Sequence, residues 1–224
     1  ASSSAINTTG VGTHAITASG ASDDNYTFNY VDGVLTINKA VLTATAQNDS
    51  RTYGDANPTF VVNYTGFKNG ETDAVIDTKA TGSSVGPTAN AGTHAITASG
   101  ASDDNYTFNY VDGVLTINKA VLTATAQNAS RTYGDANPTF VVNYTGFKNG
   151  ETDTVIDTKA TGSSVGPTAN VGTHAITASG ASDNNYSFNY VDGVLTINKA
   201  VLTTTAQNAS RTYGDANPTF TVNY

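Results

Sequence analysis

The sequence predicts an all-β protein built from tandem immunoglobulin-like β-sandwich repeats. Three observations predict this fold: the chain repeats itself with a period of 80 residues, apolar residues alternate in short segments, and turns rich in Gly, Asn and Asp separate the segments. Two complete copies, 40–119 and 120–199, align without a gap and differ at five positions. Residues 1–39 hold only the later part of a copy, and 200–224 hold only the first part. We therefore expect one folding unit repeated along an extended rod.

Composition restricts the class of protein and its partners. The chain has no Cys, Met or Trp, and only 12% of its residues are charged. A chain without cysteine is compatible with an oxidising, extracellular setting, and any secretion signal is expected to lie outside this stretch or to have been removed. The formal net charge of −8 argues against a nucleic-acid partner, because such binding depends on cationic side chains at the phosphates. No apolar run approaches the roughly 18 residues of a membrane span, so no membrane insertion is expected.

Four segments of the complete copy 40–119 show the two-residue alternation of β-strands. They are residues 41–48, 59–67, 93–100 and 106–111. The side chains expected to face the core are Leu42, Ala44, Ala46, Phe60, Val62, Tyr64, His94, Ile96, Ala98, Tyr106, Phe108 and Tyr110. Another strand is expected over 114–119, and one or two more over 74–82. The total of roughly six or seven strands per copy suggests an immunoglobulin-like sandwich.

Turn chemistry separates these strands. Residues 51–58, RTYGDANP, contain Gly and Pro and are expected to form a turn before the second strand. The Asn-Gly pair at 69–70 predicts a tight turn, and the loop 101–105 is rich in Asp and Asn. The Asp-Gly pair at 112–113 predicts a hairpin turn between the two strands that flank it.

The junction between copies contains no linker sequence. Residues 114–127 run from the last predicted strand of one copy into the first strand of the next without Gly, Pro or Ser. Flexible linkers are rich in Gly and Ser, and these fourteen residues would span roughly 45 Å when extended at about 3.3 Å each. We therefore expect neighbouring copies to be held at a fixed angle.

Three motifs together are typical of one known repeat family. They are YGDANP at 53–58, GFKNGET at 66–72, and VGTHAITASGASDDNYTFNYVDGVLTINKA at 11–40. This ordered string resembles the MBG repeat ("mostly β and glycine"), an immunoglobulin-like module found in tandem in large bacterial adhesins and other secreted surface proteins. The resemblance covers the whole copy and departs from the family at His94, where an aromatic residue such as Tyr is more usual. It implies display at the bacterial cell surface and a spacer or adhesive role, and it implies no catalytic residues.

These features predict a structural stalk, spacer or fibre-forming segment of a secreted bacterial adhesin, which gives length and stiffness in cell adhesion and biofilms. Faithful copying of one unit multiplies length or valency, whereas an enzyme needs one special site. The alternative is that the repeats are themselves an adhesive module for a glycan or protein on an unknown host or surface, with exposed aromatics such as Tyr53 and Tyr64 as contacts. An enzyme fragment is a third class, and loss of turnover on mutation of His94 would support it.

A histidine occurs once per copy on an alternating strand, at His14, His94 and His174. Zinc sites need several converging His or Cys ligands, which one histidine per copy cannot supply. We therefore expect each histidine to be packed and hydrogen-bonded. No grouping of Ser, His and Asp has distinctive spacing, so no catalytic or cofactor-binding residue is predicted. An isopeptide cross-link from Lys119 is an open alternative that requires a Lys, an Asn and a carboxylate buried together.

The acidic loop of the copy is a candidate calcium site. Asp103 and Asp104, with Asp112, offer the hard oxygen ligands that Ca²⁺ prefers. The third copy replaces the second loop aspartate by Asn184, which weakens the case for a repeated site. Asp and Asn also form turns by accepting hydrogen bonds from nearby backbone N–H groups. We favour this turn interpretation, so calcium is a secondary prediction and no other cofactor is expected.

The partial copies at the two ends of the sequence are nearly complementary. Residues 200–224 and 1–39 together supply most of one copy, missing chiefly the equivalents of 65–80. A half-sandwich exposes unpaired strand edges and an uncovered apolar face. We therefore consider head-to-tail strand complementation, in which the N-terminal part of one chain packs against the C-terminal part of an identical chain. The alternative is that the missing strands belong to a longer continuous polypeptide.

Overall fold

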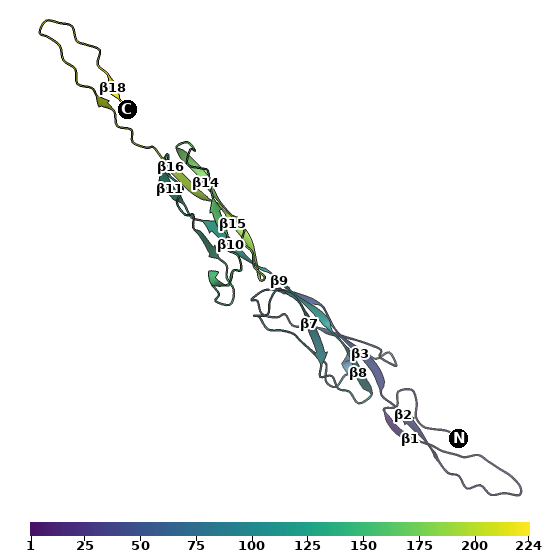
Figure 1. Cartoon of the computed structure of the whole chain (residues 1–224). Coiled ribbons are helices and arrows are strands. Elements are labelled where there is room, and N and C mark those ends of the chain that lie inside the picture. Colours follow the sequence, from purple (N-terminus) through teal and green to yellow (C-terminus); the bar gives the residue numbers. More distant parts are fainter. The chain divides into compact units, whose positions relative to one another are not determined.

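The computed structural model describes residues 1–224 as two compact units, Ala1–Ala120 and Val121–Tyr224. Each unit contains one complete copy of the repeat and one partial copy (Figure 1). Strands, turns and loops make up nearly all of the chain, and its helices are two short 3₁₀ turns, Asp73–Val75 and Asp153–Val155. The predicted all-β class is therefore confirmed. Neither helix has the length and apolar character needed to pass through a lipid bilayer.

In the first unit, the complete copy folds into two sheets. One sheet has three strands in the order β5-β3-β8, and the other has four in the order β4-β9-β7-β6. The strands are β3 (Ala40–Ala46), β4 (Asp49–Thr52), β5 (Val62–Thr65), β6 (Thr81–Ser83), β7 (Gly92–Ser99), β8 (Tyr106–Val111) and β9 (Gly113–Asn118). The pairs β3·β8 and β4·β9 are parallel, whereas β3·β5, β6·β7 and β7·β9 are antiparallel. Two parallel pairs therefore join the first part of the copy to its last part.

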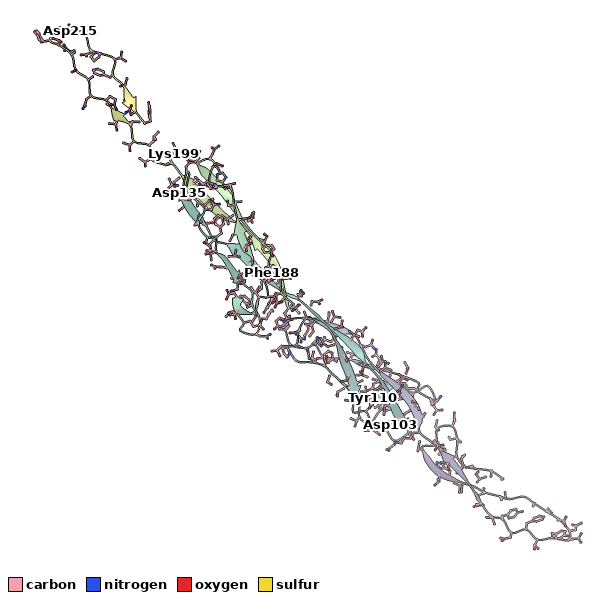
Figure 2. All side chains as sticks on the ribbon, viewed as in Figure 1. Asp103, Tyr110, Asp135, Phe188, Lys199 and Asp215 are labelled. Atoms are coloured by element: carbon pink, nitrogen blue, oxygen red, sulfur yellow. The ribbon has the colours of Figure 1, made fainter.

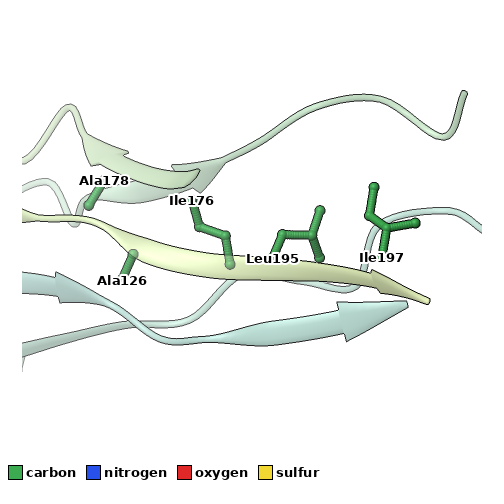
Figure 3. Packing of buried hydrophobic residues seen from close by; sticks show 5 residues of the cluster. All are labelled: Ala126, Ile176, Ala178, Leu195 and Ile197. Atoms are coloured by element: carbon green, nitrogen blue, oxygen red, sulfur yellow. The ribbon is translucent and has the colours of Figure 1, made fainter. Parts of the chain in front are cut away.

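The complete copy of the second unit has the same topology. Its sheets have the orders β12-β10-β15 and β11-β16-β14-β13. The strands are β10 (Ala120–Ala126), β11 (Ala129–Thr132), β12 (Val142–Thr145), β13 (Thr161–Ser163), β14 (Gly172–Ser179), β15 (Tyr186–Val191) and β16 (Gly193–Asn198). Strands of both sheets contribute to one buried cluster, which Figure 3 shows: Ala126, Ile176, Ala178, Leu195 and Ile197. The core of the copy thus lies between its two sheets.

Alternation along the strands decides which side chains enter the core. In β9, Leu115 and Ile117 are buried, whereas Val114 is exposed on the opposite face. The predicted inward-facing residues that are buried are Leu42, Ala44, Ala46, Ile96, Ala98 and Tyr106. Those that are half-buried are Phe60, Val62, Tyr64, His94 and Phe108. Tyr110 is exposed instead, so the aromatic face of the three-stranded sheet is only partly covered.

The hairpin predicted at the Asp-Gly pair 112–113 is wrong. β8 pairs with β3 in one sheet, and β9 pairs with β4 and β7 in the other, so the chain crosses between sheets at this point. The crossing is tight, because a Cβ atom at Gly113 would lie 2.6 Å from the carbonyl oxygen of Ala46. Asn48 Oδ1 accepts the N–H of Val114 at 2.8 Å and fixes the start of β9. The Asp-Gly pair marks the change of direction, but the partners of each strand are chosen by distant segments.

Residues 51–58 are not entirely a turn, which also corrects the sequence prediction. Arg51 and Thr52 end strand β4, which pairs with β9. Arg51 is 7% exposed, and its guanidinium donates to Asn57 Oδ1 at 2.8 Å and to the carbonyl of Gly86 at 2.7 Å. A buried cation is tolerated when hydrogen bonds satisfy its donors. The sequence does not predict β4 because its residues are polar and show no alternation. Only its pairing with the distant strand β9 identifies it.

The remaining connections agree with the sequence in part. The tight turn at 69–70 is confirmed, and both of its residues have the positive φ that a turn of this kind requires. Residues 74–82 contribute to a 3₁₀ turn and one short strand, β6. The linker-free run 114–127 holds the end of one strand and the start of the next, with Lys119 alone between β9 and β10. Lys119 is exposed, so it does not meet the burial requirement of an isopeptide cross-link.

The partial copies keep only local pairings. Residues 1–39 form the antiparallel pair β1 (Gly12–Ile16) and β2 (Gly33–Ile37). Residues 200–224 form the antiparallel pair β17 (Thr205–Ala206) and β18 (Val222–Asn223). Residues 26–31, identical in sequence to β8, form no strand and lie in the long loop between β1 and β2 (Figure 1). The large apolar side chains that these segments expose include Tyr26, Phe28, Val31, Val34, Leu202, Tyr213, Phe220 and Tyr224.

Candidate functional site at the repeat junction

The acidic loop 101–105 is organised as a turn. Asp103 Oδ1 accepts the backbone N–H of Asn105 at 2.7 Å and that of Tyr106 at 3.0 Å. Asp183 makes the same two hydrogen bonds in the next copy. These contacts agree with the turn interpretation, in which the side chain orders its own loop.

The three candidate calcium ligands are not brought together as a cluster. Asp103 is half-buried and lies in the loop before β8 (Figure 2), whereas Asp104 and Asp112 are exposed. No group of three or more His, Asp or Glu side chains in the chain is arranged to hold a metal ion. A calcium site would therefore need rearrangement or ligands from the backbone, and it stays a prediction.

The same loop contacts the partial copy that precedes it in the first unit. Asn105 Oδ1 accepts the backbone N–H of Val11 at 2.9 Å. The ammonium group of Lys39 donates to the carbonyl oxygen of Asp103 at 2.7 Å. Only Asn38 and Lys39 separate β2 from β3. The junction is thus a short connection braced by side chains from both copies.

Two further contacts complete this junction. The side-chain amide of Asn69 donates to the carbonyl oxygen of Asn7 at 3.1 Å. The carbonyl oxygen of Asn105 accepts the N–H of Ala40 at 3.0 Å, which anchors the first residue of β3. From the sequence, the loop is expected only as a turn or a calcium site. The available signal was that Asn105 and its equivalents, Asn25 and Asn185, are unchanged in a loop where the preceding residue varies.

The motif at 66–72 packs against Tyr106, the residue that follows the acidic loop 101–105. Tyr106 is 4% exposed, and its hydroxyl donates to Glu71 Oε2 at 2.6 Å while it accepts the N–H of Lys68 at 2.9 Å. Burial raises the pKa of Tyr106, and the hydrogen bond to the Glu71 carboxylate raises it further, because both disfavour the phenolate. The ring of Phe67 packs edge-on against Tyr106, with centroids 5.8 Å apart. The motif therefore links the tight turn at 69–70 to the start of β8.

A shallow groove lies beside this network in each complete copy. In the first unit it has a volume of about 440 Å³ and is lined by Val62, Asn63, Tyr64, Phe67, Glu71, Thr72 and Asp73. Its equivalent in the second unit has about 540 Å³. Several polar groups of the groove are already engaged: Tyr64 accepts the N–H of Ala80, and Asp73 pairs with Lys79 at 2.6 Å.

One proposed aromatic contact is wrong. Tyr53 is 4% exposed and is not available to a ligand on the surface. Tyr64 is half-buried, and its ring meets Phe108 edge-on at 6.2 Å. The accessible aromatic on the three-stranded sheet is Tyr110 (Figure 2), which is 37% exposed. Its ring stacks on that of Phe108.

The histidines are hydrogen-bonded, as the sequence predicted. The Nε2 atom of His94 bonds the carbonyl oxygen of Asn90 at 2.9 Å, and the side chain is half-buried on β7. His174 makes the same contact with Asn170 at 2.8 Å. A carbonyl can only accept, so the neutral ring carries its proton on Nε2. This is a contact within one turn of chain, repeated in each copy.

The fold is that of a tandem-repeat protein whose two-sheet modules are joined without linkers of Gly and Ser. The family model for the MBG domain of the YGX type matches residues 1–36, 42–116 and 122–196. The chain belongs to this family, whose modules are typical of adhesin-type surface proteins and are not an enzyme family. A comparison with curated proteins finds no match.

Proposed function

We propose that this chain is a spacer or stalk segment of a bacterial surface adhesin, located outside the cell, whose repeats supply length and stiffness. The junction between residues 1–39 and the next copy is the observation that carries this proposal. Its connection is two residues long, and hydrogen bonds from Asn105, Lys39 and Asn69 brace it. A tether that needed free motion would be built from a longer, Gly- and Ser-rich segment.

Stiffness at this junction arises from several weak contacts acting together. Each exposed hydrogen bond contributes only about 0.5–1.5 kcal/mol, which alone would permit frequent opening. Because the two-residue connection keeps the donors and acceptors close, a broken contact re-forms without a large entropic cost. A series of such junctions would transmit bending forces along the repeats.

Distance measurements between spin labels test the proposed stiffness. The chain has no cysteine, so Thr13→Cys and Thr116→Cys place two labels on exposed positions of β1 and β9, on either side of the junction. We expect a narrow distance distribution. Insertion of Gly-Gly-Ser between Lys39 and Ala40 should broaden it several-fold, because the braces no longer act over a short connection.

Matched variants separate the junction from other effects. The same insertion between residues 24 and 25 lies in an exposed loop and should leave the distribution narrow. Asn105→Ala removes the acceptor for Val11 and should broaden the distribution, whereas Asn25→Ala, the same residue in the partial copy, should not. Equal widths for the original chain and the insertion at Lys39 would contradict the spacer proposal.

The second candidate function is adhesion by the repeats themselves. The observation that favours it is the aromatic-walled groove present in both units. Aromatic faces beside amide and carboxylate groups suit a glycan or a peptide. Binding of the chain to a glycan array or to cells, lost in the double variant Asn63→Ala and Asn143→Ala, would support it. Val61→Ala, an exposed neighbour outside the groove, is the control.

A further inference from the structure

We propose that the two Asn-Gly turns of the complete copies, at 69–70 and 149–150, are sites of spontaneous deamidation, and that the contact of Asn69 with the preceding copy slows the reaction at the first turn. Deamidation converts the side-chain amide of asparagine into a carboxylate and consumes only water. It needs no partner, and it does not depend on the spacer function. The turns themselves supply the geometry that the reaction requires.

The first turn leaves the attacking nitrogen free. The φ angles are 54° at Asn69 and 74° at Gly70, and the hydrogen bond of the turn runs from the N–H of Glu71 to the carbonyl oxygen of Lys68 at 2.9 Å. The N–H of Gly70 bonds no acceptor within its unit. Both central residues are exposed, and Gly70 has no Cβ that would keep the asparagine side chain away from its nitrogen.

The reaction exchanges one bond at the amide carbon of the asparagine side chain. The backbone nitrogen of Gly70 attacks Cγ of Asn69, and the new N–Cγ bond closes a succinimide ring. The Cγ–Nδ2 bond breaks, the proton of the Gly70 N–H passes to the departing nitrogen, and ammonia leaves. Water then opens the ring at either carbonyl carbon, which gives aspartate or isoaspartate at this position. The step involves no oxidation or reduction.

The second turn has the same local structure. Its φ angles are 53° at Asn149 and 73° at Gly150, and the N–H of Glu151 donates to the carbonyl oxygen of Lys148 at 2.9 Å. The N–H of Gly150 bonds no acceptor within its unit. The sequence KNGETD is shared by the two turns. Any difference between their rates in the folded chain therefore comes from contacts outside the turn.

The two turns differ in the hydrogen bond made by the asparagine side chain. Asn69 Nδ2 donates to the carbonyl oxygen of Asn7 at 3.1 Å, whereas the side chain of Asn149 has no hydrogen-bond partner within its unit. The side chain of Asn69 must leave this contact before its Cγ can turn toward the nitrogen of Gly70. Because a typical hydrogen bond has a small net strength, Asn69 should convert about two- to tenfold more slowly than Asn149.

Conversion at Asn69 removes one brace of the junction. A carboxylate has no N–H to donate, and its charge would face the carbonyl oxygen of Asn7, which is another acceptor. Isoaspartate also adds a methylene group to the backbone of the turn that precedes Glu71, the acceptor of the Tyr106 hydroxyl. The contact therefore slows its own loss. The resulting loss of stiffness rests on the proposed spacer function, whereas the reaction does not.

Peptide mass spectrometry follows both sites in one sample of the original chain. Trypsin releases 69–79, NGETDAVIDTK, and 149–159, NGETDTVIDTK, which differ only at residues 74 and 154 and are therefore resolved by mass. When the folded chain is kept in mildly alkaline buffer, both peptides should gain the heavier, deamidated form, and 149–159 should gain it about two- to tenfold faster. In denaturant the two rates should be equal, because the sequences around the two sites are the same.

The same digest contains an internal control. Peptides 52–68 and 132–148 share the sequence TYGDANPTFVVNYTGFK. Its first asparagine precedes proline, which has no N–H to attack with, and its second precedes tyrosine within the paired strands β5 and β12. These peptides should stay unmodified in the folded chain while 149–159 converts. Their conversion at the rate of 149–159 would show that the turn geometry is not responsible, which would overturn the proposal.

Opening the junction tests the protection of Asn69. Insertion of Gly-Gly-Ser between Lys39 and Ala40 should raise the rate at Asn69 to that of the second turn, and the same insertion between residues 24 and 25 should not. A folded chain in which neither turn converts, over a period in which the denatured chain does, would overturn the proposal. Equal rates at the two turns of the folded original chain would overturn the protective role of the junction contact. Neither result depends on the distances between spin labels, which test the spacer function separately.

Discussion

Residues 12–39 and 92–119 have identical sequences but different structures. In the complete copy the segment forms three strands, β7, β8 and β9, that belong to two sheets. In the partial copy it forms only the pair β1 and β2, and the residues between them remain a loop. The same sequence thus lies in two environments. Structural features that both segments share come from local contacts, and features that differ come from contacts with distant segments.

Local contacts are the same in both segments. The strand pair has one register, since Gly12 lies opposite Ile37 as Gly92 lies opposite Ile117. The hydroxyl of Tyr30 accepts a backbone N–H nine residues earlier at 2.8 Å, and the corresponding distance in the complete copy is 2.9 Å. These features need no partner outside the segment.

The strand β8 is the feature that differs. It exists only where β3 lies beside it, and the pair buries Leu42 and Tyr106 in one cluster with Ile76. The alternating aromatics of 26–31 meet the pattern for a strand equally well, yet without that neighbour they form none. Alternation therefore states which face a strand would bury, and a partner decides whether the strand forms.

Hydrogen exchange should show the largest difference between the two segments. Peptides containing YTFNYV arise from both 26–31 and 106–111 with the same mass, so their isotope envelopes should be bimodal. The amides of β8 open only with the copy, and at about 4 kcal/mol or more of stability they should exchange about a thousandfold more slowly. The peptide YSFNYV of 186–191 should give a single protected envelope. A single envelope for YTFNYV would mean that the two segments have the same structure.

Weakening strand β3 should make β8 behave like the unpaired residues 26–31. Leu42→Ala empties a fully buried position of β3 and should lower the free energy of unfolding of its copy by about 2–5 kcal/mol. Protection of the YTFNYV peptides should then fall toward the fast population, while 186–191 stays protected. Val41→Ala, on the exposed face of the same strand, should change stability by less than about 0.5 kcal/mol, measured by denaturant unfolding.

A matched pair of glycines sharpens the comparison at the crossing between sheets. Gly113→Ala should cost about 1–3 kcal/mol, because the new Cβ would lie within 2.6 Å of Ala46 O and 2.7 Å of Gln47 O. Gly33→Ala has the same flanking sequence, but its Cβ would meet only Ile16, at 3.6 Å, so little change is expected. Thermal unfolding of both variants measures the difference. Equal melting temperatures would show that the crossing is not as tight as described.

Alkaline pH should give the smallest effect. Because the pKa of Tyr106 is raised in the folded chain, the unfolded chain loses this proton first and binds fewer protons in that range. The stabilisation is therefore present below the ordinary tyrosine pKa of about 10 and is lost as pH rises through the raised value. Tyr106→Phe should flatten the fall in melting temperature above about pH 10, whereas Tyr26→Phe, in the partial copy, should not. The same slope in all three chains would contradict this role.

Only the hydrogen bonds between near neighbours in the candidate site could be predicted from the sequence. The turn formed by Asp103 and the hydrogen bond of His94 follow from side chains that reach backbone groups within four residues. The junction contacts of Asn105 with Val11, and of Asn69 with Asn7, join residues more than sixty positions apart. No periodicity or turn rule connects such positions, so only the folded structure brings them together.

The sequence by itself determined the repeat, the all-β class, the tight turn at 69–70 and, except at Tyr110, which residues of the predicted strands face inward. These properties depend on a residue and its near neighbours, through side-chain alternation and turn chemistry. The tertiary structure decided that Asp112 and Gly113 cross between sheets, that the polar segment Asp49–Thr52 is a strand, and that one copy of YTFNYV is a strand while the other is a loop. Those outcomes depend on partners supplied by distant segments, because a strand's backbone hydrogen bonds are satisfied only by another strand.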